Sequence, residues 1–335
     1  MPADAPWAGE RIEALLTLLS GTFDHLRRLA ELPAAQAIEF VVTEDLAADV
    51  RSHVGRVVGV EDLSDYGVER VGGTVVGKTF FRDDAHRDIV IILAAEIFQA
   101  AGPQAEALAV NLASHELAHG LVGQMRSANG TPMAPSYMPW EIAPWLARYA
   151  FEEYLVDMIA EVVLRQFGHV TDADGSERPL SMQHVWPRSL EFTESACRAV
   201  ERIVDRIHTY RLDGDLEPMW QDVYSTTSQV LITLAHAQAE LDAPSADVPG
   251  EDATATLGDD LGPFHECWAE MHRLFAAFPL IATPERFAEL EPELLRGCGA
   301  LIMELWAKIG LTFRPEGDAF HITVAGPFDA WPLAS

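Results

Sequence analysis

Two histidines and a glutamate, His115, Glu116 and His119, interrupt the largely apolar stretch NLASHELAHGLVG (residues 111–123). Burying imidazoles and a carboxylate costs free energy unless these groups are paired or bind a metal ion. On a helix, residues four apart lie one turn apart and about 40° round, so both imidazoles can face one ion. Glu116 is turned by about 100° from His115, where it suits holding a water molecule better than a metal. This HExxH spacing predicts a metal site with an adjacent general base.

A catalytic zinc site usually takes three protein ligands and leaves one position open. The segment YAFEEYLVDMIAE (residues 149–161) offers four carboxylates as the third ligand: Glu152, Glu153, Asp157 and Glu161. Glu153 and Asp157 are four apart and share a helix face, whereas Glu152 is turned by about 100° from Glu153. The spacing by itself leaves the choice among them open.

The order HELAH (residues 115–119), then Glu153-Tyr-Leu-Val-Asp157, resembles the gluzincin metallopeptidases. The resemblance covers residues 74–167 and implies an α+β, zincin-like catalytic half. It implies that His115, His119 and Glu153 bind Zn²⁺, that Glu116 is the general base, and that Asp157 supports a ligand histidine from behind. It also implies that the strand hairpin before the HExxH helix aligns the substrate.

One other carboxylate competes for the third ligand position. Glu141, in PWEIAPW (residues 139–145), is closer in sequence to the histidines, but prolines flank it and no Asp follows four residues later. We therefore favour Glu153. Glu152 and Glu161 are expected to be solvated or to lie behind the ligands.

Hydrolysis at such a site needs a further hydrogen-bond donor for the tetrahedral oxyanion. Tyr137, His208 and Tyr210 are candidates, and the sequence does not choose among them. A second His-Glu pair opens HECWAEMH (residues 265–272), but Ala269 stands where the HExxH pattern needs His. We interpret that segment as a packed helix.

Hydrophobic periodicity and turn residues predict the elements that must position these groups. The expected helices, strands and loops are, in chain order: helix 9–31, strand 56–60, strands 74–81 and 88–93 as a hairpin, helix 103–125, loop 126–144, helix 145–167, a polar break at 171–180, helices across 189–309 interrupted by an acidic mobile loop at 243–263, and strand 320–324. The pattern indicates two domains, with residues 1–170 as the catalytic half and residues 171–335 as a mostly helical half.

Composition narrows the classes of partner. The formal net charge is −29, which repels phosphate backbones and anionic membranes and favours cationic peptides or proteins. The three cysteines form no CxxC pair, which favours free thiols in a reducing compartment. The N-terminus has acids where a secretory signal needs bases, and the most apolar run is too short and acidic to span a bilayer. We expect a cytoplasmic protein.

Two further function classes use the same residues. Two His and one carboxylate also form the facial triad of non-haem Fe(II) oxygenases, and a zinc site can simply stabilise a binding protein. Glu116 argues for a peptidase, because neither alternative needs a base beside the metal.

Overall fold

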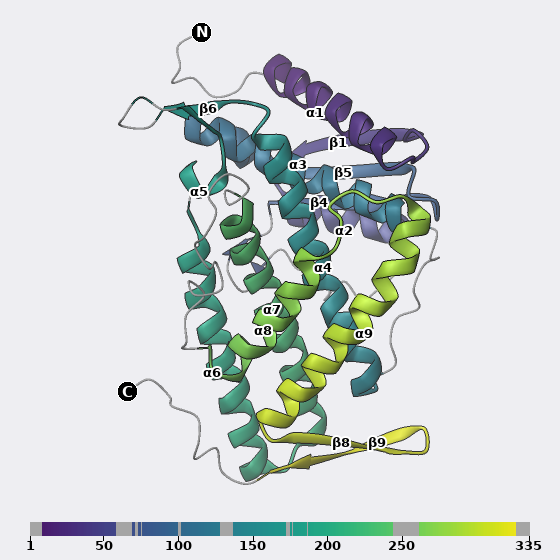
Figure 1. Ribbon diagram of the computed structural model, residues 1–335, viewed down its shortest axis with the longest axis vertical. Helices are drawn as coiled ribbons and strands as arrows, with labels where there is room; N and C mark the ends of the chain where they lie inside the picture. The colour runs from purple at the N-terminus through teal and green to yellow at the C-terminus, as the bar shows by residue number, and fades with distance from the viewer. Residues whose placement is uncertain are drawn as a thin grey trace.

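The computed structural model describes residues 9–57, 69–70, 73–74, 76–99, 102–127, 137–171, 175, 177–185, 187–243 and 261–325. Helices dominate this part of the chain (Figure 1). The α-helices are α1 (Gly9–Leu29), α2 (Leu46–Val57), α3 (Pro103–Arg126), α4 (Pro139–Leu164), α5 (Met182–Val185), α6 (Ser189–Asp213), α7 (Leu216–Asp242), α8 (Pro263–Ala276) and α9 (Pro284–Lys308), and a 3-10 helix spans Ala95–Phe98. The strands are β1 (Ala37–Thr43), β2 (Glu69–Arg70), β3 (Gly73–Thr74), β4 (Gly77–Phe81), β5 (Asp88–Ala94), β6 (His169–Thr171), β7 (Glu177–Pro179), β8 (Leu311–Glu316) and β9 (Ala319–Val324).

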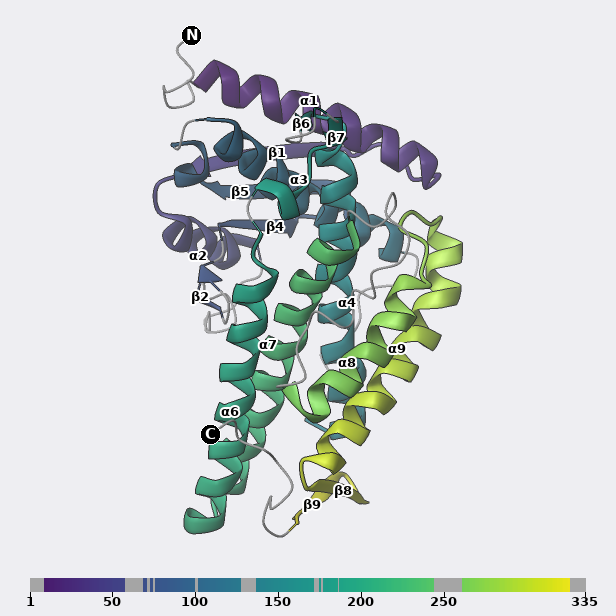
Figure 2. The ribbon, with the colours of Figure 1, turned by 60° about the vertical axis from the view of Figure 1, so that its left-hand side comes forward.

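The largest sheet has three strands in the order β1-β5-β4. The central strand β5 pairs in parallel with β1 and antiparallel with β4. Its sequence, DIVIILA, is apolar on both faces because helices cover both. Ile89 and Ile91 belong to the core shared with α1 and α3, whereas Val90 and Ile92 pack with Leu46 of α2. Figure 2 shows α1 and α2 on opposite sides of this sheet.

The long helices α4, α6, α7 and α9 extend away from the sheet, and the β8–β9 hairpin lies at the far end (Figure 2). One buried apolar cluster runs from α1 and β5 through α3 and α4 into α6–α9. This cluster includes residues on both sides of position 170. The division of the chain into two domains there stays a prediction.

Most of the expected elements are confirmed, and two expectations are wrong. The predicted helix at 9–31, hairpin at 74–93 and helix at 103–125 correspond to α1, β4–β5 and α3. The predicted strand at 56–60 is wrong at 56–57, which end α2, while 58–60 lie outside the described residues. The predicted loop is wrong from Pro139, because this proline occupies the first turn of α4, where its missing N–H costs nothing.

The hydrophobic periodicity does not predict two strands of the fold. These are β1, which pairs with β5, and β8, which forms a hairpin with the expected last strand β9. Pro144 lies inside α4 and packs against Gly299 of α9, where an added Cβ would come within 2.7 Å of the proline ring. Most of the expected acidic loop, residues 244–260, lies outside the described residues.

No helix among the described residues combines the length and the apolar character needed to cross a bilayer.

Candidate metal centre

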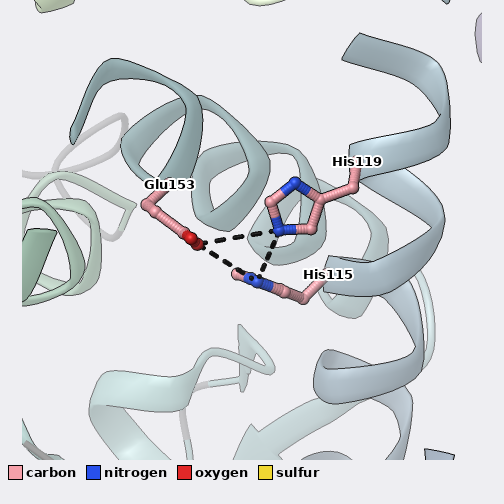
Figure 3. Close-up of side chains that lie close together, drawn as sticks. All are labelled: His115, His119 and Glu153. Atoms are coloured by element: carbon pink, nitrogen blue, oxygen red, sulfur yellow. Dashed lines mark hydrogen bonds and ion pairs between the residues drawn. The ribbon is translucent and has the colours of Figure 1, made fainter. Parts of the chain in front are cut away.

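The imidazoles of His115 and His119 and the carboxylate of Glu153 converge between α3 and α4 (Figure 3). The two Nε2 atoms are 3.2 Å apart. Glu153 Oε2 lies 3.4 Å from Nε2 of His115 and 3.7 Å from Nε2 of His119. Ligand atoms around a tetrahedral zinc ion are separated by about 3.3 Å. The distances between these three donor atoms are therefore close to those of ligands that share one metal ion. In the described part of the chain, they form the only such group of His, Cys, Asp and Glu.

The hydrogen bonds on the other side of each ring fix which nitrogen faces the site. Nδ1 of His115 lies 2.6 Å from Asp157 Oδ1, and Nδ1 of His119 lies 2.9 Å from Glu152 Oε1. A carboxylate partner places the first ring proton on Nδ1, so each Nε2 presents a lone pair when its ring is neutral. Two such lone pairs facing each other beside a carboxylate oxygen repel one another unless a proton or a metal ion lies among them. The donor set therefore fits a divalent metal ion.

Helix geometry explains why α4 supplies both a candidate ligand and the groups behind the ligands. Glu153 and Asp157 are one turn apart on one face, and Asp157 reaches the ring of His115. The neighbouring Glu152 points in another direction and reaches His119. On α3, Ala113 and Ala118 are fully buried, and such small side chains allow close packing against neighbouring elements.

The electrostatics of the site favour the ionised form of two carboxyl groups, those of Glu153 and Asp157. Burial raises the pKa of Glu153, but His115, His119 and His236 together outweigh it and hold the pKa well below its usual value. Burial likewise opposes ionisation of Asp157, yet His236 and His115 lower its pKa to about 2. For His115, burial lowers the pKa, and Asp157 with Glu153 more than reverses this, so that the pKa is well above its usual value. A metal ion at Nε2 of His115 would compete with a proton for that nitrogen.

Glu116 is buried and faces strand β4 from the neighbouring helix α3. The Thr79 hydroxyl lies 2.7 Å from the Glu116 backbone oxygen and 2.8 Å from its Oε2. Gly77 lies directly against the same side chain, because a Cβ at position 77 would be 2.7 Å from Glu116 Cγ and Oε1. The carboxylate thus has a defined seat formed by two β4 residues. It is not one of the three clustered donors, which agrees with its predicted position on the flank.

A third histidine, which no sequence motif marks, lies beside the three donors. His236 on α7 places its Nδ1 2.6 Å from Asp157 Oδ2, so the two oxygens of Asp157 hold His115 and His236. Its Nε2 lies 3.9 Å from Glu153 Oε2, and its ring stacks on Phe192. His236 follows Asp157 by 79 residues. No spacing rule connects such distant positions, and only the packing of α7 on α4 brings them together.

The other sequence candidates lie elsewhere. Glu141 is exposed in the first turn of α4, three turns before Glu153. Glu161 is buried, accepts a hydrogen bond from the Met182 N–H, and has its pKa raised to about 7 by burial. Tyr137 and His208 are exposed, and Tyr210 is half-buried. The last turn of α6, which follows His208 and Tyr210, contacts Ala325 after β9 rather than the metal centre.

The segment 265–272 is a packed helix, as expected. It lies in α8, where His272 Nε2 is 2.7 Å from Asp242 Oδ2. Asp242 also accepts a hydrogen bond from the Tyr154 hydroxyl, so this network joins α4, α7 and α8.

Comparison with known proteins gives no relative: no family model, no curated protein and no solved structure matches the chain.

Proposed function

We propose that this protein is a zinc-dependent metallopeptidase of the gluzincin type. The observation that carries the proposal is the placement of Glu116, a buried carboxylate next to His115 in the chain, which is not one of the three clustered donors and is held by Thr79 of the edge strand β4. A structural metal site needs no such group, and an Fe(II) oxygenase uses the triad without it. Two imidazoles and one carboxylate suit zinc and leave a coordination position for a water molecule.

A bound zinc ion would supply a Lewis acid for the scissile carbonyl and would lower the pKa of a water molecule. Glu116 takes the proton of the attacking water and then delivers it to the leaving amine. Glu153 contributes the negative donor, while Asp157 and Glu152 keep the imidazoles in the required tautomer.

Strand β4 offers a main-chain edge on which a peptide can lie. The Ala94 N–H donates to the Val76 carbonyl, and the Arg82 N–H donates to the Asp88 carbonyl. Along an antiparallel strand, the N–H and C=O groups of one residue point to the partner strand and those of the next residue point away from it. The N–H and C=O groups of Gly77, Thr79 and Phe81 therefore face away from β5. No strand of the described residues pairs with that edge. An extended substrate added there would pass the seat of Glu116.

His236 is the donor that this mechanism requires for the oxyanion. We prefer it to the earlier candidates Tyr137, His208 and Tyr210. Its Nε2 lies 3.9 Å from Glu153 Oε2, while Asp157 holds its Nδ1. In its protonated form, His236 donates from Nε2 to the oxygen of the tetrahedral intermediate.

The net charge of −29 supports a cationic peptide or protein as the substrate, and we propose that class here. The experiment that tests the function is hydrolysis of a library of cationic, unstructured peptides by zinc-loaded protein, with the Glu116→Gln variant as control. Metal analysis of protein purified without added metal distinguishes zinc from iron.

His236→Gln is expected to lower kcat about 10²-fold at saturating zinc, because removing one oxyanion donor typically costs about 10²–10³ in rate. KM should change little, since the ground-state substrate does not need this donor. The measurement is steady-state hydrolysis alongside zinc stoichiometry. His208→Gln, which changes an exposed histidine on α6, is the matched control. Full kcat in the His236 variant would remove this residue from the mechanism.

Gly77→Ala is expected to slow hydrolysis about tenfold or more while leaving zinc content and folding intact. The added methyl group would occupy the space of the Glu116 carboxylate, and displacing a reacting group by about 1 Å can cost 10²-fold. Gly21→Ala on α1, where nothing lies within 4 Å of an added Cβ, is the control. If both variants hydrolyse the peptide at the wild-type rate, the seat of Glu116 does not matter for catalysis.

A further inference from the structure

A buried arginine lies at the end of the helix that carries the two histidines. Arg126 is in the last turn of α3, two turns after His119, and is 4% exposed. A guanidinium in such a place needs carboxylate partners to offset the loss of hydration. It has two, supplied by different helices: Glu152 of α4 and Glu291 of α9.

These contacts form one continuous chain of charged groups that ends at the metal centre. Glu291 Oε1 accepts from Arg126 Nε at 2.6 Å. Arg126 pairs through Nη1 with Glu152 Oε2, and the second oxygen of Glu152 lies 2.9 Å from His119 Nδ1. Glu291 is therefore linked to a candidate metal ligand through two intermediates, although it follows Arg126 by 165 residues.

The charge balance shows what Glu291 does for His119. Arg126 is shared between two carboxylates, so Glu152 keeps enough negative charge to accept a strong hydrogen bond from His119. Without the charge of Glu291, the guanidinium is drawn towards Glu152 alone and competes with that hydrogen bond. His119 then loses both its fixed orientation and part of the basicity that makes Nε2 a good ligand.

We propose that Glu291 is a positioning residue for the metal, so that helix α9 sets metal affinity through Arg126, Glu152 and His119. The inference rests on the metal-binding triad of the proposed function, and it does not depend on peptide hydrolysis. His115 is supported in a comparable way, because its partner Asp157 is held by His236 of α7. Both imidazoles of the triad thus depend on helices that follow them by more than a hundred residues.

The test is the zinc affinity of the full chain, measured by competition with a chromogenic chelator at fixed pH. Glu291→Gln is expected to raise the Kd for zinc 10–100-fold, the range found for groups that orient metal ligands. Glu289→Gln is the matched control, because Glu289 is on the same helix and its side chain is 67% exposed in a surface pair with Arg286. This control should keep the wild-type Kd.

Two further measurements separate positioning from general stability. The visible spectrum of the Co²⁺-loaded protein should change in Glu291→Gln and stay unchanged in Glu289→Gln, since only the first alters the ligand geometry. If Glu291→Gln does not fold, Glu291→Asp, which keeps the charge but shortens its reach to Arg126, should also raise the Kd. A folded variant of Glu291 with the wild-type Kd and Co²⁺ spectrum would overturn the proposal.

The outcome is distinguishable from failure of the proposed function. Wild-type protein that binds no zinc would overturn the metal centre and this proposal together. Wild-type protein that binds zinc and cleaves no peptide would count against the peptidase alone, and the affinity ranking would still support the role of Glu291. At saturating zinc, Glu291→Gln should regain hydrolysis, because occupancy and not chemistry is what it has lost.

Discussion

Peptide hydrolysis is expected to fall at least 10²-fold when Glu116 is changed to Gln, while the fold and the zinc content stay as in wild type. Glutamine keeps the size of the side chain and still accepts a hydrogen bond from Thr79, so the seat on β4 is preserved. It cannot accept the proton of the attacking water. General acid–base catalysis typically contributes about 10²–10⁴-fold, which sets the expected loss.

The measurement needs a substrate. A cationic peptide library is used because the chain has a net charge of −29 and should attract cationic peptides. Zinc stoichiometry and the circular dichroism spectrum of the variant must match those of wild type for the rate to be interpreted. Hydrolysis that survives in Glu116→Gln would exclude this residue as the base. Wild-type protein that binds zinc tightly but cleaves nothing in a broad library would favour the zinc-stabilised binding protein over the enzyme.

Stoichiometric zinc is expected to be lost from purified protein in the His115→Ala and His119→Ala variants. Each removes one of three donors that lie within 4.8 Å of one another, and the remaining two cannot enclose the ion. Metal content is measured by elemental analysis after dialysis. If both variants retain full zinc, the metal binds at another place and the assignment of the centre fails.

The third donor is tested by a ranking of two glutamates on the same helix. Glu153→Gln should weaken zinc binding far more than Glu141→Gln, because an amide oxygen is a poor zinc ligand and only Glu153 lies at the centre. Glu141 is exposed at the start of α4, so its variant serves as the control for loss of one negative charge. The reverse ranking would move the ligand to the start of the helix.

The sequence by itself determined the local geometry of the centre. HELAH on a helix fixes the relation of His115 to His119, and four-residue spacing fixes that of Glu153 to Asp157, because both depend only on the helical repeat. The structure brings His115, His119 and Glu153 together and places Asp157 against His115. Hydrophobic periodicity also located α1, α3 and the β4–β5 hairpin, since each buries a face whose period is visible in the sequence.

Only the tertiary structure decided which distant side chains complete the site. His236 and Glu291 are ordinary members of helical segments, and their importance comes from the packing of α7 and α9 against α4. The two adjacent glutamates of α4 could not be ranked by spacing alone, because one turn of helix presents either of them to α3. Long-range packing places Glu153 among the candidate metal donors and leaves Glu152 to hold His119, since Glu152 also pairs with Arg126, which Glu291 shares.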